Sequence, residues 1–166
     1  MKKTLVLYYS WSCGNTERVA ARLAEAAGAD LERIRTVDPY PKSYDQTVEQ
    51  GRHEVEDGFE PELEPLEHDP ADYDLVAVGS PTWWYTMAPA VASMFSSTDL
   101  AGKLVVPFVT NAGWAGSALE DMEAAATGAT VIEPKEVRFD SNGGSRMVTA
   151  QGELDTWAER VARLVK

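Results

Sequence analysis

The polar residues of the segment 10–16 could bind an anion, because the segment follows an apolar run and leads into a helical pattern. A loop between the end of a strand and the start of a helix offers unpaired backbone N–H groups and the positive end of the helix dipole. The segment reads Ser10, Trp11, Ser12, Cys13, Gly14, Asn15 and Thr16. It has no lysine, and neither G-x-x-x-x-G-K-S/T nor G-x-G-x-x-G spacing is present. The segment therefore predicts a cradle for a small phosphate monoester held by neutral donors.

Two further segments place large aromatic side chains where turns usually carry small polar residues. One consists of Pro81, Thr82, Trp83, Trp84 and Tyr85, and the other contains Thr110, Asn111, Ala112, Gly113, Trp114 and Gly116. Consecutive side chains of an extended loop cannot all point into the core, so at least one ring must face a ligand or solvent. The alternative is that Trp83 or Trp84 packs as a cover over the helix that follows. Together with the phosphate cradle, the two segments predict a phosphorylated planar ligand whose ring stacks on aromatic side chains.

The elements that must position these segments alternate between strands and helices along the chain. Predicted strands are Thr4–Tyr9, Leu31–Val37, Asp74–Gly79, Leu104–Val109 and one within Thr130–Phe139. Predicted helices are Thr16–Ala27, Ala88–Ser97, Ser117–Ala126, one within Asp38–Asp72 marked by Tyr44, Val48 and Val55, and a last one marked by Leu154, Trp157, Val161 and Leu164. This alternation predicts an α/β fold, with a parallel sheet of five strands covered by helices on both faces. Ligands of such sheets bind beyond the carboxyl ends of the strands, where the three segments should meet.

Composition and charge narrow the class of protein. The length of 166 residues and 44% hydrophobic content predict one domain over residues 1–166. No apolar run is long enough for a signal peptide or a membrane span, so we expect a soluble, cytoplasmic protein without a membrane partner. The 27 acidic and 15 basic residues give a net charge of −12, which disfavours nucleic acid. An acidic surface could steer the chain toward basic protein patches, or could serve solubility alone.

No side chain stands out as an acid, base or metal ligand, and we expect neither a catalytic residue nor a metal site. His53 and His68 lie in the polar middle section, where a surface role is expected. Cys13 is the only cysteine, which excludes an internal disulfide. A thiol at a helix N-terminus could act as a nucleophile, but without a histidine partner we expect Cys13 to shape the loop. A phospho-receiver domain is excluded, because Tyr9–Ser10 and Gly79–Ser80 stand where acidic residues would be needed.

In their order along the chain, these motifs resemble the flavodoxin family, closest to its short bacterial members. Tyr9–Thr16 is similar to the first family loop, Y-S-x-S-G-N-T, and Gly79–Met87 contains the second, G-x-P-x-W-W. The likeness continues through Val106–Asn111, Tyr40–Pro41 and Asn142–Arg146. The resemblance implies a flavodoxin-like fold and non-covalently bound FMN. It implies that the phosphate is held by Ser10, Ser12, Gly14, Asn15 and Thr16, and that Pro81–Tyr85 and Thr110–Gly116 flank the isoalloxazine ring.

The chain departs from the family pattern at two places. Cys13 resembles an insertion in the phosphate loop, and Asn111 stands where relatives often carry a histidine. An asparagine cannot titrate near neutral pH, so any proton transfer by that histidine is absent here.

Two functions remain open from the sequence. In the first, the protein carries electrons between redox protein partners with basic patches. In the second, it is an NAD(P)H-dependent FMN oxidoreductase that reduces a quinone or another small acceptor. The acidic charge and the absence of arginine from the aromatic segments favour the carrier, since the 2′-phosphate of NADPH usually needs a basic partner. Arg146 is the one arginine that the sequence offers for it, and the section Asp38–Asp72 could roof a substrate pocket.

Overall fold

The computed structural model describes residues 1–166 and alternates strands with helices, as the sequence predicts. The strands are β1 (Thr4–Tyr8), β2 (Asp30–Arg33), β3 (Leu75–Trp83), β4 (Thr86–Met87), β5 (Leu104–Asn111), β6 (Thr130–Val131) and β7 (Lys135–Arg138). The helices are α1 (Asn15–Ala27), α2 (Tyr44–Asp57), α3 (Pro89–Ser97), α4 (Ala118–Ala125) and α5 (Gln151–Val165), with a short 3-10 turn at Pro70–Asp72. Gly28, in the left-handed conformation with φ 60°, ends α1 where the sequence places its stop signal.

The strands form one sheet in the order β2-β1-β3-β5-β6, and all pairs along this path are parallel. β7 also pairs with β5 in parallel, beyond β6, so the predicted last strand is split into two pieces along one edge. Between the pieces Glu133 has a positive φ of 48°, a conformation that interrupts a strand. β4 pairs with β3 antiparallel. The predicted α/β class with a parallel five-stranded sheet is therefore confirmed.

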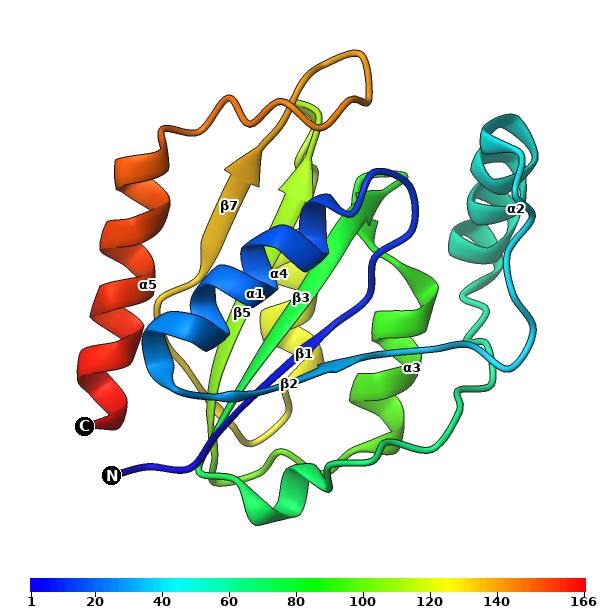
Figure 1. The fold of residues 1–166 in the computed structure, drawn as a ribbon. Coiled ribbons are helices and arrows are strands. Elements are labelled where there is room, and N and C mark those ends of the chain that lie inside the picture. Colours follow the sequence, from blue (N-terminus) through cyan, green and yellow to red (C-terminus); the bar gives the residue numbers. More distant parts are fainter.

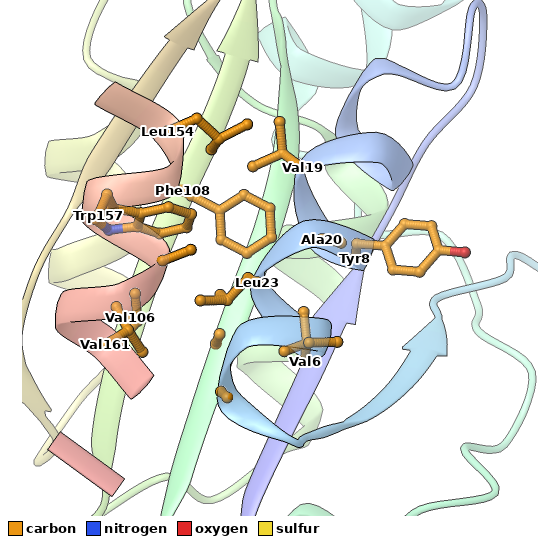
Figure 2. Packing of buried hydrophobic residues seen from close by; sticks show 14 of the residues in the cluster. Val6, Tyr8, Val19, Ala20, Leu23, Val106, Phe108, Leu154, Trp157 and Val161 are labelled. Carbon is orange, nitrogen blue, oxygen red and sulfur yellow. The ribbon is translucent and has the colours of Figure 1, made fainter. Parts of the chain in front are cut away.

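Helices cover both faces of the sheet, as Figure 1 shows. α1 and α5 lie on one face, where Leu23 and Trp157 pack over Val6 and Phe108 (Figure 2). α3 and α4 lie on the other face, over strand residues that alternate with the first set. None of the helices is both long and apolar enough to cross a membrane. The two layers hold the strands of the sheet in place, and their carboxyl ends define one edge of the molecule.

Two predicted elements differ from the structure. β2 ends at Arg33 rather than at Val37, which is 45% exposed and lies in a bend after an isolated bridge between Thr36 and Leu63. α2 lies where a helix was predicted, but Tyr44, Val48 and Val55 are not its buried residues; Thr47, Gly51 and Glu54 are. The reason is that α2 does not cover the aliphatic sheet. It stands beyond the carboxyl ends of the strands (Figure 1) and packs Gly51 against the ring of Trp83.

Candidate functional site

A cleft of about 280 Å³ opens at the carboxyl edge of the sheet, where the three predicted segments meet. The predicted residues that line it are Ser10, Trp11, Ser12, Cys13, Asn15, Thr16, Pro81, Thr82, Trp83, Trp84, Thr110, Asn111 and Ala112. The sheet positions them, because β1, β3 and β5 are adjacent and parallel and release their chains at the same edge.

The first segment presents a row of free backbone donors. None of the N–H groups from Ser10 to Glu17 donates a hydrogen bond within the protein. Gly14 begins the helix in the left-handed conformation, with φ 73°, and no side chain caps α1. The buried hydroxyl of Thr16 joins that of Thr110 at 2.8 Å, which ties the loop to the end of β5. Unpaired N–H groups at the positive end of a helix are the chemistry that binds a phosphate.

The turn after β7 closes the outer side of this loop. The thiol of Cys13 donates to the carbonyl of Gly143 at 3.3 Å, and the amide of Asn15 donates to the carbonyl of Gly144 at 3.1 Å. Both side chains therefore hold the neighbouring turn, as expected for a Cys13 that shapes the loop.

The first aromatic segment is a hairpin rather than an extended loop. β3 continues to Trp83, and Trp84 and Tyr85 form the turn to β4 with φ values of 50° and 69°. A type I′ turn needs positive φ at both central residues, which bulky side chains rarely adopt. The N–H of Ser117 holds the carbonyl of Tyr85 at 2.8 Å, and Gly116 permits this approach, since a Cβ there would lie 2.2 Å from the same oxygen. The surrounding structure thus maintains an unfavourable turn, a feature that concentrates at functional sites.

Trp83 both lines the cleft and packs inward. Its ring meets the edges of Tyr9 and Tyr40, with centroids 5.8 Å and 5.0 Å apart. The hydroxyl of Tyr40 donates to Glu54 of α2 at 2.6 Å. Burial raises the pKa of the Tyr9 and Tyr40 phenols well above their usual range, and the Glu54 carboxylate adds to the shift. The two phenols therefore stay neutral and support Trp83 as a rigid wall.

Trp84 lines both the cleft and a second hollow of about 340 Å³. Its indole N–H donates to the carbonyl of Val48 at 2.8 Å, and its side chain is exposed. The second hollow is lined by the aromatic residues Tyr44, Trp84, Tyr85 and Trp114, with Thr82, Asn111, Ala112, Ser141, Asn142 and Gly143, and none of these carries a charge. A planar neutral molecule could lie in it beside a ligand of the cleft.

The hydroxyl of Thr82 is the one buried side-chain polar atom that lacks a hydrogen-bond partner. Thr82 lines both the cleft and the second hollow. Leaving such a group unpaired costs free energy, so its place between aromatic walls indicates that a ligand supplies the partner. Neutral donors, aromatic side chains and one free hydroxyl line the same cleft, a combination that fits a phosphorylated flat ring.

Some predicted residues lie outside the cleft. Tyr85 and Trp114 line only the second hollow, and Gly14, Gly113 and Gly116 line neither, since their positive φ values serve turns. His53 and His68 are also outside both, as expected. Arg146, with a side chain 72% exposed, pairs with Asp140 at 3.8 Å.

The sequence reasoning missed several lining residues, which are Tyr44, Thr47, Val48 and Gly51 of α2 together with Phe139, Asp140, Gly143 and Gly144. Of these residues, Gly51 could have been found from the sequence, because an isolated glycine within a helical pattern usually permits a close packing contact.

Comparisons with known proteins agree with this fold. The family model described as Flavodoxin matches residues 3–160, so the chain belongs to the flavodoxin family. The predicted family is thereby confirmed. A Caulobacter vibrioides protein named NAD(P)H dehydrogenase (quinone) is 33% identical over 138 residues, which are 80% of this chain and 59% of that protein. A Gluconacetobacter diazotrophicus protein of the same name is 34% identical over 68% of this chain and 58% of its own length. The chain therefore spans less than two thirds of these relatives.

Solved structures share the fold at lower identity. The structure of a flavoprotein in complex with FMN from Lactobacillus acidophilus NCFM has a TM-score of 0.70 and 24% identity, covering 95% of this chain and 99% of that one. The flavodoxin, WrbA-like protein from Agrobacterium tumefaciens has a TM-score of 0.64 and 20% identity over the full length of both chains.

Proposed function

We propose that this protein binds FMN non-covalently in the cleft and carries electrons between redox partners in the cytoplasm. The observation that carries the cofactor is that one cleft is lined both by the segment with unbonded N–H groups, from Ser10 to Thr16, and by Thr82, whose hydroxyl has no partner. The family and the FMN complex of the Lactobacillus acidophilus flavoprotein support the same cofactor.

Bound FMN supplies the redox chemistry, because its isoalloxazine ring accepts and releases electrons. The residues of the chain bind and orient it. The loop N–H groups hold the phosphate, Trp83 and Trp84 form the wall for the ring, and the hydroxyl of Thr82 donates to or accepts from a polar atom of that ring. Asn111 cannot transfer a proton, because an amide does not titrate near neutral pH; its amide donates to Glu136 at 3.0 Å and its oxygen accepts from the N–H of Gly113 at 2.8 Å, which orients the side chain.

Reconstitution tests the cofactor. Apoprotein mixed with one equivalent of FMN should bind it tightly, shift the flavin absorbance and quench its fluorescence as the ring meets the tryptophans. Protein that leaves the flavin spectrum unchanged and elutes free of FMN would show that the cleft serves another ligand.

The second hollow favours an alternative, an NAD(P)H-dependent FMN oxidoreductase that reduces a quinone or another small acceptor. The hollow shares Thr82, Trp84 and Asn111 with the cleft, so a small planar acceptor bound there would touch the cofactor. The curated relatives named NAD(P)H dehydrogenase (quinone) favour the same activity, although the chain covers only 59% of the first of them.

Anaerobic reduction separates the two functions. A carrier bound to FMN should keep its yellow colour for minutes in excess NADH or NADPH and bleach when a ferredoxin reductase is added. Rapid bleaching by either pyridine nucleotide alone, followed by turnover of a soluble quinone, would establish the oxidoreductase instead.

A further inference from the structure

Arg33 contacts the phosphate loop from outside the cleft. It is the last residue of β2, and its Nη1 donates to the carbonyl of Ser10 at 3.2 Å. Its side chain is 34% exposed and lines neither the cleft nor the second hollow. In a trans peptide the carbonyl and the next N–H point in opposite directions. Holding the Ser10 carbonyl on the outside therefore turns the N–H of Trp11 toward the inside of the loop.

The same guanidinium forms an ion pair with Glu17, through Nη2 and Oε2. The hydroxyl of Tyr8 donates to that carboxylate oxygen at 3.1 Å, and the Tyr8 ring lies 5.5 Å from the guanidinium carbon. The hydrogen bond from Arg33 lowers the pKa of the Glu17 carboxyl. Glu17 is therefore ionised at neutral pH.

Glu17 places a negative charge close to the segment that is proposed to bind a negatively charged phosphate. It lies in the first turn of α1, the turn whose N–H groups face the cleft. An acidic residue there suits the helix dipole, but a phosphate monoester carries about −1.5 to −2 charges at pH 7 and would be repelled. Arg18, the next residue, keeps its charge but is not paired with Glu17; it donates to the carbonyl of Ser145 at 3.4 Å, and its guanidinium carbon lies 5.9 Å from the centre of the Phe139 ring. Arg33 is the cation paired with Glu17.

We propose that Arg33 is a positioning residue for the phosphate of the bound cofactor, because it fixes the Ser10 peptide and neutralises Glu17. The inference rests on the proposed binding of FMN. It explains how a loop without lysine or arginine accepts a doubly charged group, because the cation that neutralises Glu17 lies outside the contact surface.

Paired titrations with FMN and riboflavin test it, because riboflavin presents the same ring without the phosphate. Arg33→Met should raise the Kd for FMN about three- to tenfold, the range expected for a partly exposed charge contact. The Kd for riboflavin should stay within about twofold of wild type. Glu17→Gln should act in the opposite direction and lower the Kd for FMN, since it removes the repulsion and frees the charge of Arg33. The double variant should lie closer to wild type than Arg33→Met alone.

Arg22→Met is the matched control. It removes the same charge from α1, the helix that carries Glu17, and breaks a partly exposed pair with Asp155 at 2.8 Å, without a contact to the loop. Its FMN affinity should match wild type. If Arg33→Met weakens FMN and riboflavin equally, or if Glu17→Gln weakens FMN as Arg33→Met does, the pair is merely structural and the inference is wrong. Wild-type protein that binds neither flavin would overturn the proposed function itself.

Discussion

At the scale of single residues, several polar side chains around the cleft already form hydrogen bonds within the protein, and the polar groups left unbonded are available to a ligand. The side chains of Asn15, Asn111 and Tyr40 are all engaged within the protein. Groups without a protein partner include the N–H groups of the first loop, the hydroxyls of Ser10 and Ser12, and the buried hydroxyl of Thr82. All of these are backbone or neutral groups, so the site recognises its ligand by hydrogen bonds and leaves compensation of charge to residues outside the contact surface.

Replacement of Thr82 by valine should therefore separate stability from binding. The valine keeps the shape but removes a buried hydroxyl without a partner, so the free energy of unfolding of the apoprotein should stay equal or rise by about 1 kcal/mol. The Kd for FMN should rise about threefold to tenfold, because the bond to the ligand is lost. Urea unfolding of the apoprotein and flavin titration measure the two effects. A valine variant that loses stability while binding FMN normally would contradict this role.

At the scale of elements, aliphatic periodicity predicted the sheet and its covering helices because those elements bury ordinary core faces. Leu23 and Trp157, for example, pack on the sheet as their spacing indicates. The motif segments were placed at the cleft for a related reason, since they follow adjacent parallel strands.

The buried face of α2 and the hairpin after β3 could not be predicted, because both depend on tertiary contacts that the spacing of apolar residues does not indicate. The buried face of α2 consists of Thr47, Gly51 and Glu54, because it meets an aromatic cluster and not an aliphatic sheet. The hairpin at Trp84 and Tyr85 was unforeseen because neither residue favours positive φ. Tertiary contacts from Ser117 and Gly116 maintain it.

Two substitutions in the turn at Trp84 and Tyr85 should separate its effect on stability from its effect on FMN binding. Trp84→Asn and Tyr85→Gly each place a residue that tolerates positive φ. Tyr85→Gly should stabilise the apoprotein by about 0.5–1 kcal/mol, whereas Trp84→Asn also loses the indole bond to Val48 and should change stability little. Only Trp84→Asn should weaken FMN binding severalfold, because Trp84 lines the cleft and Tyr85 does not. Thermal unfolding and flavin titration of the two variants provide the comparison. If the two variants bind FMN with equal affinity, Trp84 does not contact the flavin.

At the scale of the whole molecule, buried phenols link the site to global stability. The pKa values of Tyr9 and Tyr40 are raised by burial in the folded chain, whereas an unfolded phenol ionises near about pH 10. Above that pH the unfolded chain binds fewer protons than the folded one, so the free energy of unfolding must fall as pH rises. Urea unfolding between about pH 9 and pH 11 should show this decline, and Tyr9→Phe should make it shallower. If the free energy of unfolding of Tyr9→Phe falls with pH at the same slope as that of wild type, groups other than Tyr9 cause the decline.

The net charge of −12 should act on encounters with partners, and its distribution can be tested. α2 lines the cleft and carries the exposed Asp45 and Asp57, whereas Glu25 and Glu159 are exposed on α1 and α5 and line an open hollow apart from the cleft. If the protein is a carrier, the rate of electron transfer to a basic redox protein should fall as salt shortens the Debye length to about 8 Å at 0.15 M.

The charge-reversal pair Asp45→Lys with Asp57→Lys should slow this transfer at low salt by about tenfold and flatten its salt dependence. The control pair Glu25→Lys with Glu159→Lys changes the net charge equally and should slow it far less, because steering depends on charges beside the exposed cofactor. Stopped-flow mixing of reduced protein with the partner at several salt concentrations measures both. Electron transfer to a neutral quinone involves no such attraction. If transfer to quinone is faster than transfer to the redox protein and neither pair of substitutions changes its rate, the result would favour the oxidoreductase.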